Sequence, residues 1–137
     1  ITKETSVSIN DVLHLYQAVG WTNYTNQPQM LEQALSHSLT TYLARDGEEI
    51  VGLVRLVGDG FSSVFVQDLI VLPSYQRQGI GSNLMKEALA DYKDAYQIQL
   101  ATEQTEKNLG FYRSLGFETL STYDCTGMIW VDRKKFK

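Results

Sequence analysis

The chain has few cysteines and few prolines. Among its 137 residues it has one cysteine, Cys125, which excludes an internal disulfide framework. It has two prolines and no linker rich in proline, glycine or serine, so we expect a single domain over residues 1–137. No run approaches the ~20 apolar residues of a membrane span, and no signal-peptide pattern is present. We therefore expect a soluble, cytoplasmic protein, while the start at Ile1 rather than Met leaves the natural N-terminus open.

Positive charge is also scarce. Twelve lysines and arginines stand against 16 aspartates and glutamates, which gives a net charge of −4 and a pI near 5.1. Such a chain has no general attraction for nucleic-acid phosphates or anionic lipid, so we expect neither a nucleic-acid nor a membrane partner. An anionic ligand would have to be held by a local arrangement of groups. The 43% hydrophobic content is enough to bury a core.

Helical and strand patterns alternate along the chain, which predicts an α/β (α+β) fold. A helix capped by Ser8 or Asn10 ends at Gly20, and the polar and aromatic stretch GWTNYTN separates it from the next helix. The run 62–72 is almost continuously apolar, so we place it at the centre of the sheet with both faces buried. The remaining predictions are helices at 27–38, 82–94 and 105–115, and strands at 40–46, 48–57, 96–102, 117–123 and 127–133.

The stretch YQRQGIG lies between the apolar run and the following helix. Two glycines one residue apart, just ahead of a helix, leave several backbone N–H groups uncovered, and such a place suits an anion. The unit 63–103 reads as strand, helix, strand, and ligands of open α/β sheets bind at the carboxyl ends of such strands. The chain has no nucleotide-triphosphate loop, and Leu84 occupies the third glycine position of a dinucleotide fingerprint. The pyrophosphate of coenzyme A is the remaining good candidate.

The segment LIVLPSYQRQGIGSNLM resembles the cofactor motif of the GNAT superfamily of acyl-CoA-dependent N-acetyltransferases. The motif Q/R-x-x-G-x-G/A is matched by Gln76, Gly79 and Gly81, and FYRSLGFE (111–118) is similar to the family's aromatic-Tyr-x-x-x-Gly-Phe element. The resemblance covers nearly the whole chain, and more narrowly it extends to plant plastid enzymes that acetylate arylalkylamines or protein lysines. It implies a GNAT fold with a mixed sheet of about six or seven strands and about four helices, splayed between the central strand and the next.

The resemblance also implies where acetyl-CoA binds, with no metal required. Its pantetheine arm would pair with the strand backbone at Leu69 and Val71. Asn108, one helical turn before Tyr112, could bond a cofactor amide or phosphate, although the family often has an Asn at the position of Thr105. Arg77 either contacts a phosphate or points to solvent. The loop residues assigned to the cofactor are Gln76, Arg77, Gln78, Gly79, Ile80, Gly81 and Ser82.

Acetyl transfer to an amine sets requirements for a base and an acid. With a pKa near 10.4, about one alkylamine in 2,500 is neutral at pH 7, a deficit of roughly 4.6 kcal/mol. We expect Tyr112 to protonate the departing thiolate, against the alternative of a tyrosine packed in the core. Many family members use a strand Glu as base, at a position that here is Gln67, which cannot accept a proton. Asp68 is the candidate base if a β-bulge re-aims it, with a structural role for Asp68 and a water chain as alternatives.

The acceptor amine, a small molecule or a protein lysine, should bind near aromatic side chains. Trp21, Tyr24 and Tyr123 could frame it, or they could be ordinary core or interface aromatics. A rival function is a non-catalytic acyl-CoA-binding sensor, which the missing Glu at Gln67 favours and Tyr112 opposes. The sequence leaves the oligomeric state open, with a homodimer as one possibility.

Overall fold

The computed structural model describes residues 1–130 and residue 132. Contacts between residues group the chain into two compact units, Ile1–Thr102 and Glu103–Lys137. A single domain over 1–137 stays a prediction. Within the described part of the chain, no helix is long and apolar enough to cross a membrane.

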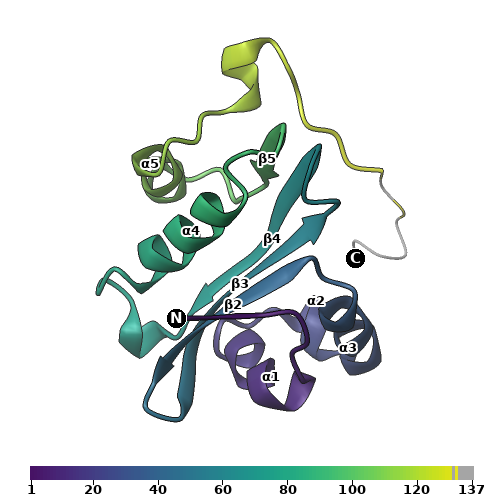
Figure 1. Cartoon of the computed structure of the whole chain (residues 1–137), viewed down its shortest axis with the longest axis vertical. Coiled ribbons are helices and arrows are strands. Elements are labelled where there is room, and N and C mark those ends of the chain that lie inside the picture. Colours follow the sequence, from purple (N-terminus) through teal and green to yellow (C-terminus); the bar gives the residue numbers. More distant parts are fainter. Residues whose placement is uncertain (131, 133–137) are drawn as a thin grey trace. The chain divides into compact units, whose positions relative to one another are not determined.

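The first unit is built on a mixed five-stranded sheet (Figure 1). Its strands lie in the order β1 (Thr2–Glu4), β2 (Thr40–Asp46), β3 (Glu49–Gly58), β4 (Ser63–Val71) and β5 (Gln97–Leu100). The first four are antiparallel to their neighbours, and β5 runs parallel to β4. The fold class is confirmed, with five strands in the described residues in place of about six or seven.

Helices cover both faces of this sheet (Figure 1). On one side lie α1 (Ile9–Ala18), α2 (Thr22–Thr25) and α3 (Pro28–Ser36), and on the other lies α4 (Ile80–Asp91). The N–H of Asn10 donates to the Ser8 hydroxyl at 3.2 Å, which caps α1 as expected. The main apolar cluster joins α1, α2 and α3 to the sheet and includes Val12, Leu15, Tyr16, Leu31, Leu35, Leu43, Leu53 and Ile70.

The position predicted for the apolar run is wrong. The run forms β4, which is fourth of five strands, and β3 is the central one. β4 is not buried along its whole length, because Ser63 and Gln67 are exposed and Phe65, Leu69 and Val71 are only partly buried. The buried residues of β4 are Val64, Val66, Asp68 and Ile70.

The second unit contains α5 (Glu106–Ser114) and the short 3-10 helix η2 (Leu120–Tyr123). The strand predicted at 117–123 is wrong, since side chains there satisfy one another locally: the Thr119 hydroxyl bonds those of Ser121 and Thr122. The strand predicted at 127–133 is absent from residues 127–130 and 132, while 131 and 133 lie outside the described residues.

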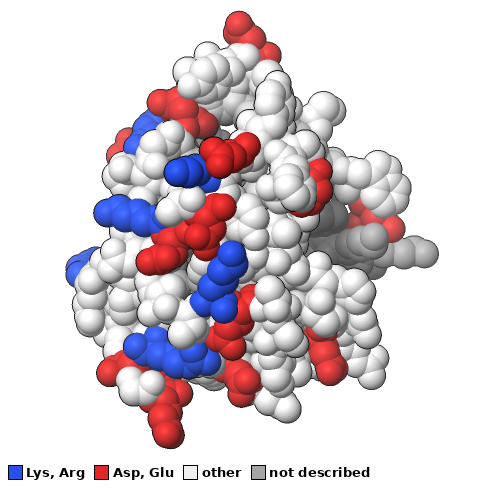
Figure 2. Space-filling view, in the orientation of Figure 1, with Lys and Arg blue, Asp and Glu red and all other residues white. Residues whose placement is uncertain are grey.

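Charged side chains of both signs are interspersed on the face shown in Figure 2. The exposed ion pairs include Lys3 with Asp91 at 3.5 Å and Arg45 with Glu4 at 3.3 Å. Positive and negative side chains therefore lie close to one another over much of this face. A local arrangement of donors is needed to hold an anionic ligand there, as the composition predicts.

Candidate functional site

The loop between β4 and α4 has the backbone of an anion cradle. After the 3-10 turn η1 (Pro73–Tyr75), Arg77 and Gly79 take left-handed conformations, with φ of 66° and 82°. Successive turns of this kind direct N–H groups into one concave space. Gly79 is the N-cap of α4 and supplies no side-chain cap, so the N–H groups of the first helical turn stay open at the positive end of the helix.

Two side chains fix this loop to the sheet. The Gln76 amide donates to the Val71 carbonyl at 3.1 Å, so this side chain anchors the loop to the end of β4. The Tyr75 hydroxyl donates to Asp46 at 2.7 Å, in the β2–β3 hairpin, and this bond raises the pKa of Tyr75 to about 12. A cavity of about 340 Å³ lies beside the loop, with Asp46, Tyr75 and Gln78 in its wall. The loop is thus attached both to the end of β4 and to the β2–β3 hairpin.

One edge of β4 is open next to the loop. β5 pairs with β4 from Ser63 to Val66 only, so Gln67–Val71 have no partner from β5. This is the splay that the sequence resemblance predicts. Leu69 and Val71, the residues assigned to the pantetheine arm, lie on this segment. An open strand edge can pair with an extended chain that carries amides.

A β-bulge marks the place where the open edge begins. Arg55 of β3 pairs with Asp68 and Leu56 pairs with Val66, so Gln67 is the extra residue of β4. Since neighbouring residues of β3 face opposite sides, Val66 and Asp68 do too. The bulge turns Asp68 toward the helices α1 and α2, where its carboxylate is bound by their side chains.

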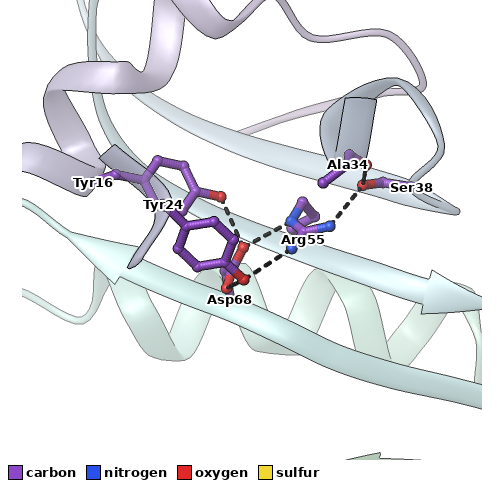
Figure 3. Close-up of polar contacts among 6 residues, drawn as sticks. All are labelled: Tyr16, Tyr24, Ala34, Ser38, Arg55 and Asp68. Carbon is purple, nitrogen blue, oxygen red and sulfur yellow. Dashed lines mark hydrogen bonds and ion pairs between the residues drawn. The ribbon is translucent and has the colours of Figure 1, made fainter. Parts of the chain in front are cut away.

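Asp68 is the centre of a buried polar network (Figure 3). It accepts hydrogen bonds from the hydroxyls of Tyr16 at 2.8 Å and Tyr24 at 2.9 Å, and it pairs with the Arg55 guanidinium at 2.7 Å. Arg55 also donates to the hydroxyls of Ser38 and Tyr24, both at 3.2 Å. Arg55 and Asp68 are 4% and 3% exposed. These contacts favour the structural role that the sequence leaves open for Asp68.

The protonation of this network follows from its burial. Burial, and then the charge of Asp68, raise the pKa of Tyr16 and of Tyr24. Burial alone would lower the pKa of Arg55, but the adjacent Asp68 raises it. The tyrosines therefore remain protonated donors and Arg55 remains a cation.

A family model for the acetyltransferase (GNAT) domain matches residues 37–119, a range that runs from β2 to α5 and includes the loop. The chain belongs to the GNAT acetyltransferase family. A solved GNAT-family acetyltransferase of Streptococcus pneumoniae TIGR4 is 76% identical, with 96% of each chain covered and a TM-score of 0.89.

More distant relatives agree with the GNAT assignment. The chloroplastic serotonin N-acetyltransferase 2 of rice is 29% identical over 82% of this chain and 58% of its own. A GNAT acetyltransferase of Elizabethkingia anophelis, solved with acetyl-CoA bound, shares the fold at 21% identity and a TM-score of 0.64, over 85% of this chain and 75% of its own. The chain spans about half the length of the curated plant relatives that it matches first.

The residues predicted to bind the acceptor amine, Trp21, Tyr24 and Tyr123, are divided between the two units. In the first unit, the ring centroids of Trp21 and Tyr24 are 6.3 Å apart, and that of Tyr16 lies 5.0 Å from Tyr24. Tyr24 is 9% exposed and its hydroxyl binds Asp68, whereas Trp21 is half-buried. Tyr123 lies in η2 of the second unit and is 71% exposed. Within the first unit, the structure brings Trp21 and Tyr24 together.

Tyr112 and Asn108 both lie on α5 in the second unit. The Tyr112 ring packs between Phe111 and Phe117, with centroids at 5.0 and 6.0 Å, and burial raises its pKa. Among the described residues nothing hydrogen-bonds its hydroxyl. The Asn108 N–H donates to the Thr105 hydroxyl at 3.1 Å, so Thr105 caps the helix.

Sequence reasoning missed three residues of the network: Arg55, Tyr16 and Ser38. A signal for Arg55 exists, because it is the one charge inside the apolar part of EEIVGLVRLV. Its pairing with Asp68 depends on the bulge register, which the sequence pattern does not reveal. In the part of the chain that the structure describes, no cluster of three or more His, Cys, Asp or Glu side chains could hold a metal.

Proposed function

We propose that the protein transfers the acetyl group of acetyl-CoA to a primary amine by direct attack within a ternary complex. The observation that carries this proposal is the left-handed loop at the start of α4, continuous with the open edge of β4. One feature suits a pyrophosphate and the other suits an arm with amides. The two are adjacent in the chain and in the fold.

The loop suits the cofactor in charge and in space. Open N–H groups at the start of α4 favour phosphate by about 0.3–1 kcal/mol per charge through the helix dipole. A Cβ built at Gly79 meets nothing within 4 Å, so the space over the loop is free. The guanidinium of Arg77 can add a charge contact to a cofactor phosphate. Arg77→Gln tests this contact, because its loss should make the affinity for acetyl-CoA less dependent on salt. Backbone donors thus explain how a chain of charge −4 could hold an anionic cofactor.

For the transfer step, Tyr112 is the proposed general acid. A tyrosine hydroxyl is protonated at neutral pH, and burial, which raises the pKa of Tyr112, keeps it so, which leaves its proton available to the departing thiolate. Because three donors already engage Asp68, we propose that water rather than this carboxylate removes the amine proton. Asp68→Asn tests the alternative: loss of kcat with an unchanged unfolding free energy would return Asp68 to the role of base.

A second candidate is an acyl-CoA sensor without turnover. Gln67 favours it, because an amide at the bulge cannot take the amine proton. Both candidates predict cofactor binding, and only the enzyme predicts amine-dependent release of the CoA thiol.

The deciding experiment measures binding and turnover on the same preparation. Calorimetry with acetyl-CoA is followed by thiol release with arylalkylamines, polyamines, aminoglycosides and lysine peptides. The panel includes arylalkylamines and lysine peptides because one relative is named a serotonin N-acetyltransferase and a soybean relative a histone acetyltransferase. Binding with amine-dependent release supports the enzyme, binding without release on any amine supports the sensor, and no binding removes both.

A further inference from the structure

The loop before α4 contains a residue whose conformation needs support. Arg77 has φ of 66°, a left-handed conformation that a residue with a Cβ keeps only where its surroundings hold it. Residues 77–79 are exposed, and a Cβ built at Gly79 meets no atom within 4 Å. The support must therefore come from the residues that precede or follow this exposed segment.

Packing gives the loop little support on the side of the β2–β3 hairpin. A cavity of about 340 Å³ lies there, and its wall includes residues of both strands and of the loop: Ala44, Arg45, Asp46, Val51, Tyr75 and Gln78. Gln78, which stands between the two left-handed residues, therefore borders open space on this side and not packed side chains. Hydrogen bonds have to fix the loop where packing does not.

Two side-chain hydrogen bonds leave the loop, and they differ in reach. The Gln76 amide donates to the carbonyl of Val71, which is only five residues earlier, so this bond shapes the turn locally. The Tyr75 hydroxyl donates at 2.7 Å to Asp46, which is 29 residues away in the sequence. Tyr75 and Asp46 both line the cavity, so their bond joins its two sides.

Asp46 is a well-fixed partner for this bond. It is the last residue of β2 and pairs with Glu49 of β3, and Gly47 at φ 62° lies in the turn between them. A carboxylate can only accept a hydrogen bond, so the Tyr75 hydroxyl is the donor. The position of Tyr75 is thus set by the hairpin and not by the loop alone.

We propose that the hydrogen bond from Tyr75 to Asp46 holds residues 76–82 in the conformation that binds acetyl-CoA, so that Tyr75 is a positioning residue for the cofactor. The inference rests on the proposed function, which places the pyrophosphate on this loop. Without the bond, the loop keeps its local contact at Gln76 but loses its attachment to the hairpin, and Arg77 can relax. The N–H groups of the cradle then no longer converge on one space.

The test compares Tyr75→Phe with a matched control, Tyr42→Phe. Each change removes one hydroxyl that donates to an aspartate, since Tyr42 of β2 donates at 2.6 Å to Asp91, the last residue of α4. Tyr75→Phe should raise the Kd for acetyl-CoA about threefold to tenfold, the effect of one lost hydrogen bond. Tyr42→Phe, which acts at the far end of α4, should leave this Kd unchanged. Calorimetry measures both values.

Changes at Asp46 separate the hydrogen bond from the charge of the side chain. Asp46→Asn keeps an oxygen that can accept from the Tyr75 hydroxyl, so its Kd should stay within about twofold of the wild type. Asp46→Ala removes the acceptor and should bind as weakly as Tyr75→Phe. The double variant Tyr75→Phe/Asp46→Ala should bind no more weakly than either single variant, because both changes remove the same bond.

Thermal unfolding of each variant checks that weaker binding is not a loss of the folded state. An unchanged Kd in Tyr75→Phe, or an equal rise in Tyr75→Phe and Tyr42→Phe, would overturn the inference. Binding by Asp46→Asn that is as weak as that by Asp46→Ala would overturn it too. A wild type that binds no acetyl-CoA would instead remove the proposed function itself.

Discussion

At the residue scale, the main feature is the buried ion pair of Arg55 and Asp68. Two charges that are 4% and 3% exposed are costly to bury, and each is tolerated because the other is present. The hydroxyls of Tyr16, Tyr24 and Ser38 satisfy the remaining donors and acceptors. The pair therefore joins α1 and α2 to the bulge of β4.

Arg55→Leu should lower the free energy of unfolding by about 3–5 kcal/mol, because it leaves the Asp68 carboxylate buried without a counter-charge. Lys3→Ala is the control, since the Lys3–Asp91 pair is exposed and should contribute less than about 1 kcal/mol. Urea unfolding followed by circular dichroism measures both. Equal losses in the two variants would show that the buried pair has no special weight.

Tyr112→Phe should lower kcat by about 10²-fold or more, while the Kd for acetyl-CoA stays the same, because only the proton donor is lost. The control is Tyr96→Phe, which changes a tyrosine that is 83% exposed. Steady-state rates and calorimetry give the two quantities. A kcat that matches the Tyr96→Phe control would exclude Tyr112 as the acid.

At the scale of elements, the loop and α4 form one functional unit. Gly79 stands at φ 82° as the N-cap of α4, where a residue with a Cβ is strained. Arg77 has the same left-handed conformation, with φ of 66°, which is uncommon for residues other than glycine. Two left-handed residues therefore lie directly before α4, where the anion is expected.

Gly79→Ala should weaken acetyl-CoA binding about fivefold, since relaxing the left-handed strain displaces the N–H groups of the cradle. Gly20→Ala is a matched control, because Gly20 has φ 71° and, like Gly79, open space around its Cβ position. Both variants should lose similar stability, and calorimetry should find weaker binding in Gly79→Ala alone. Equal affinities in the two would contradict a cofactor role for the loop.

The sequence predicts most elements of the first unit, because apolar periodicity and local caps determine them. Ser8 caps α1, and the Asp46-Gly47 turn joins β2 to β3. β1 could not be predicted, since three polar residues at Thr2–Glu4 pair only because β2 offers its edge. The sequence predicts a bulge near Asp68 only as a condition for re-aiming that residue, and it does not place the bulge at Gln67, because register depends on the partner strand.

At the scale of the whole molecule, buried tyrosines make stability depend on high pH. Burial is the largest cause that raises the pKa of Tyr16, Tyr24 and Tyr42 in the folded state. The unfolded chain releases these protons near pH 10, whereas the folded chain keeps them. Above about pH 10 the unfolded state binds fewer protons, so stability falls as pH rises, and below it the full stability is present.

The urea concentration at the unfolding midpoint should therefore be lower at about pH 10.5 than at about pH 8. Tyrosinate absorbance of the folded protein should show part of the eight tyrosines ionising well above pH 10. Tyr42→Phe should reduce the drop, because it removes one of the shifted groups. Complete ionisation near pH 10 in the folded state would contradict the buried network.

Initial rates with both acetyl-CoA and the amine varied distinguish direct acetyl transfer from transfer through an acetylated protein. A ternary complex predicts amine-dependent thiol release and double-reciprocal lines that intersect. Parallel lines would instead indicate that the acetyl group is first transferred to the protein. Loss of this turnover in Cys125→Ser, a variant of the single cysteine, would place the group on that thiol. That result, or binding of acetyl-CoA with no release on any amine, would contradict the account.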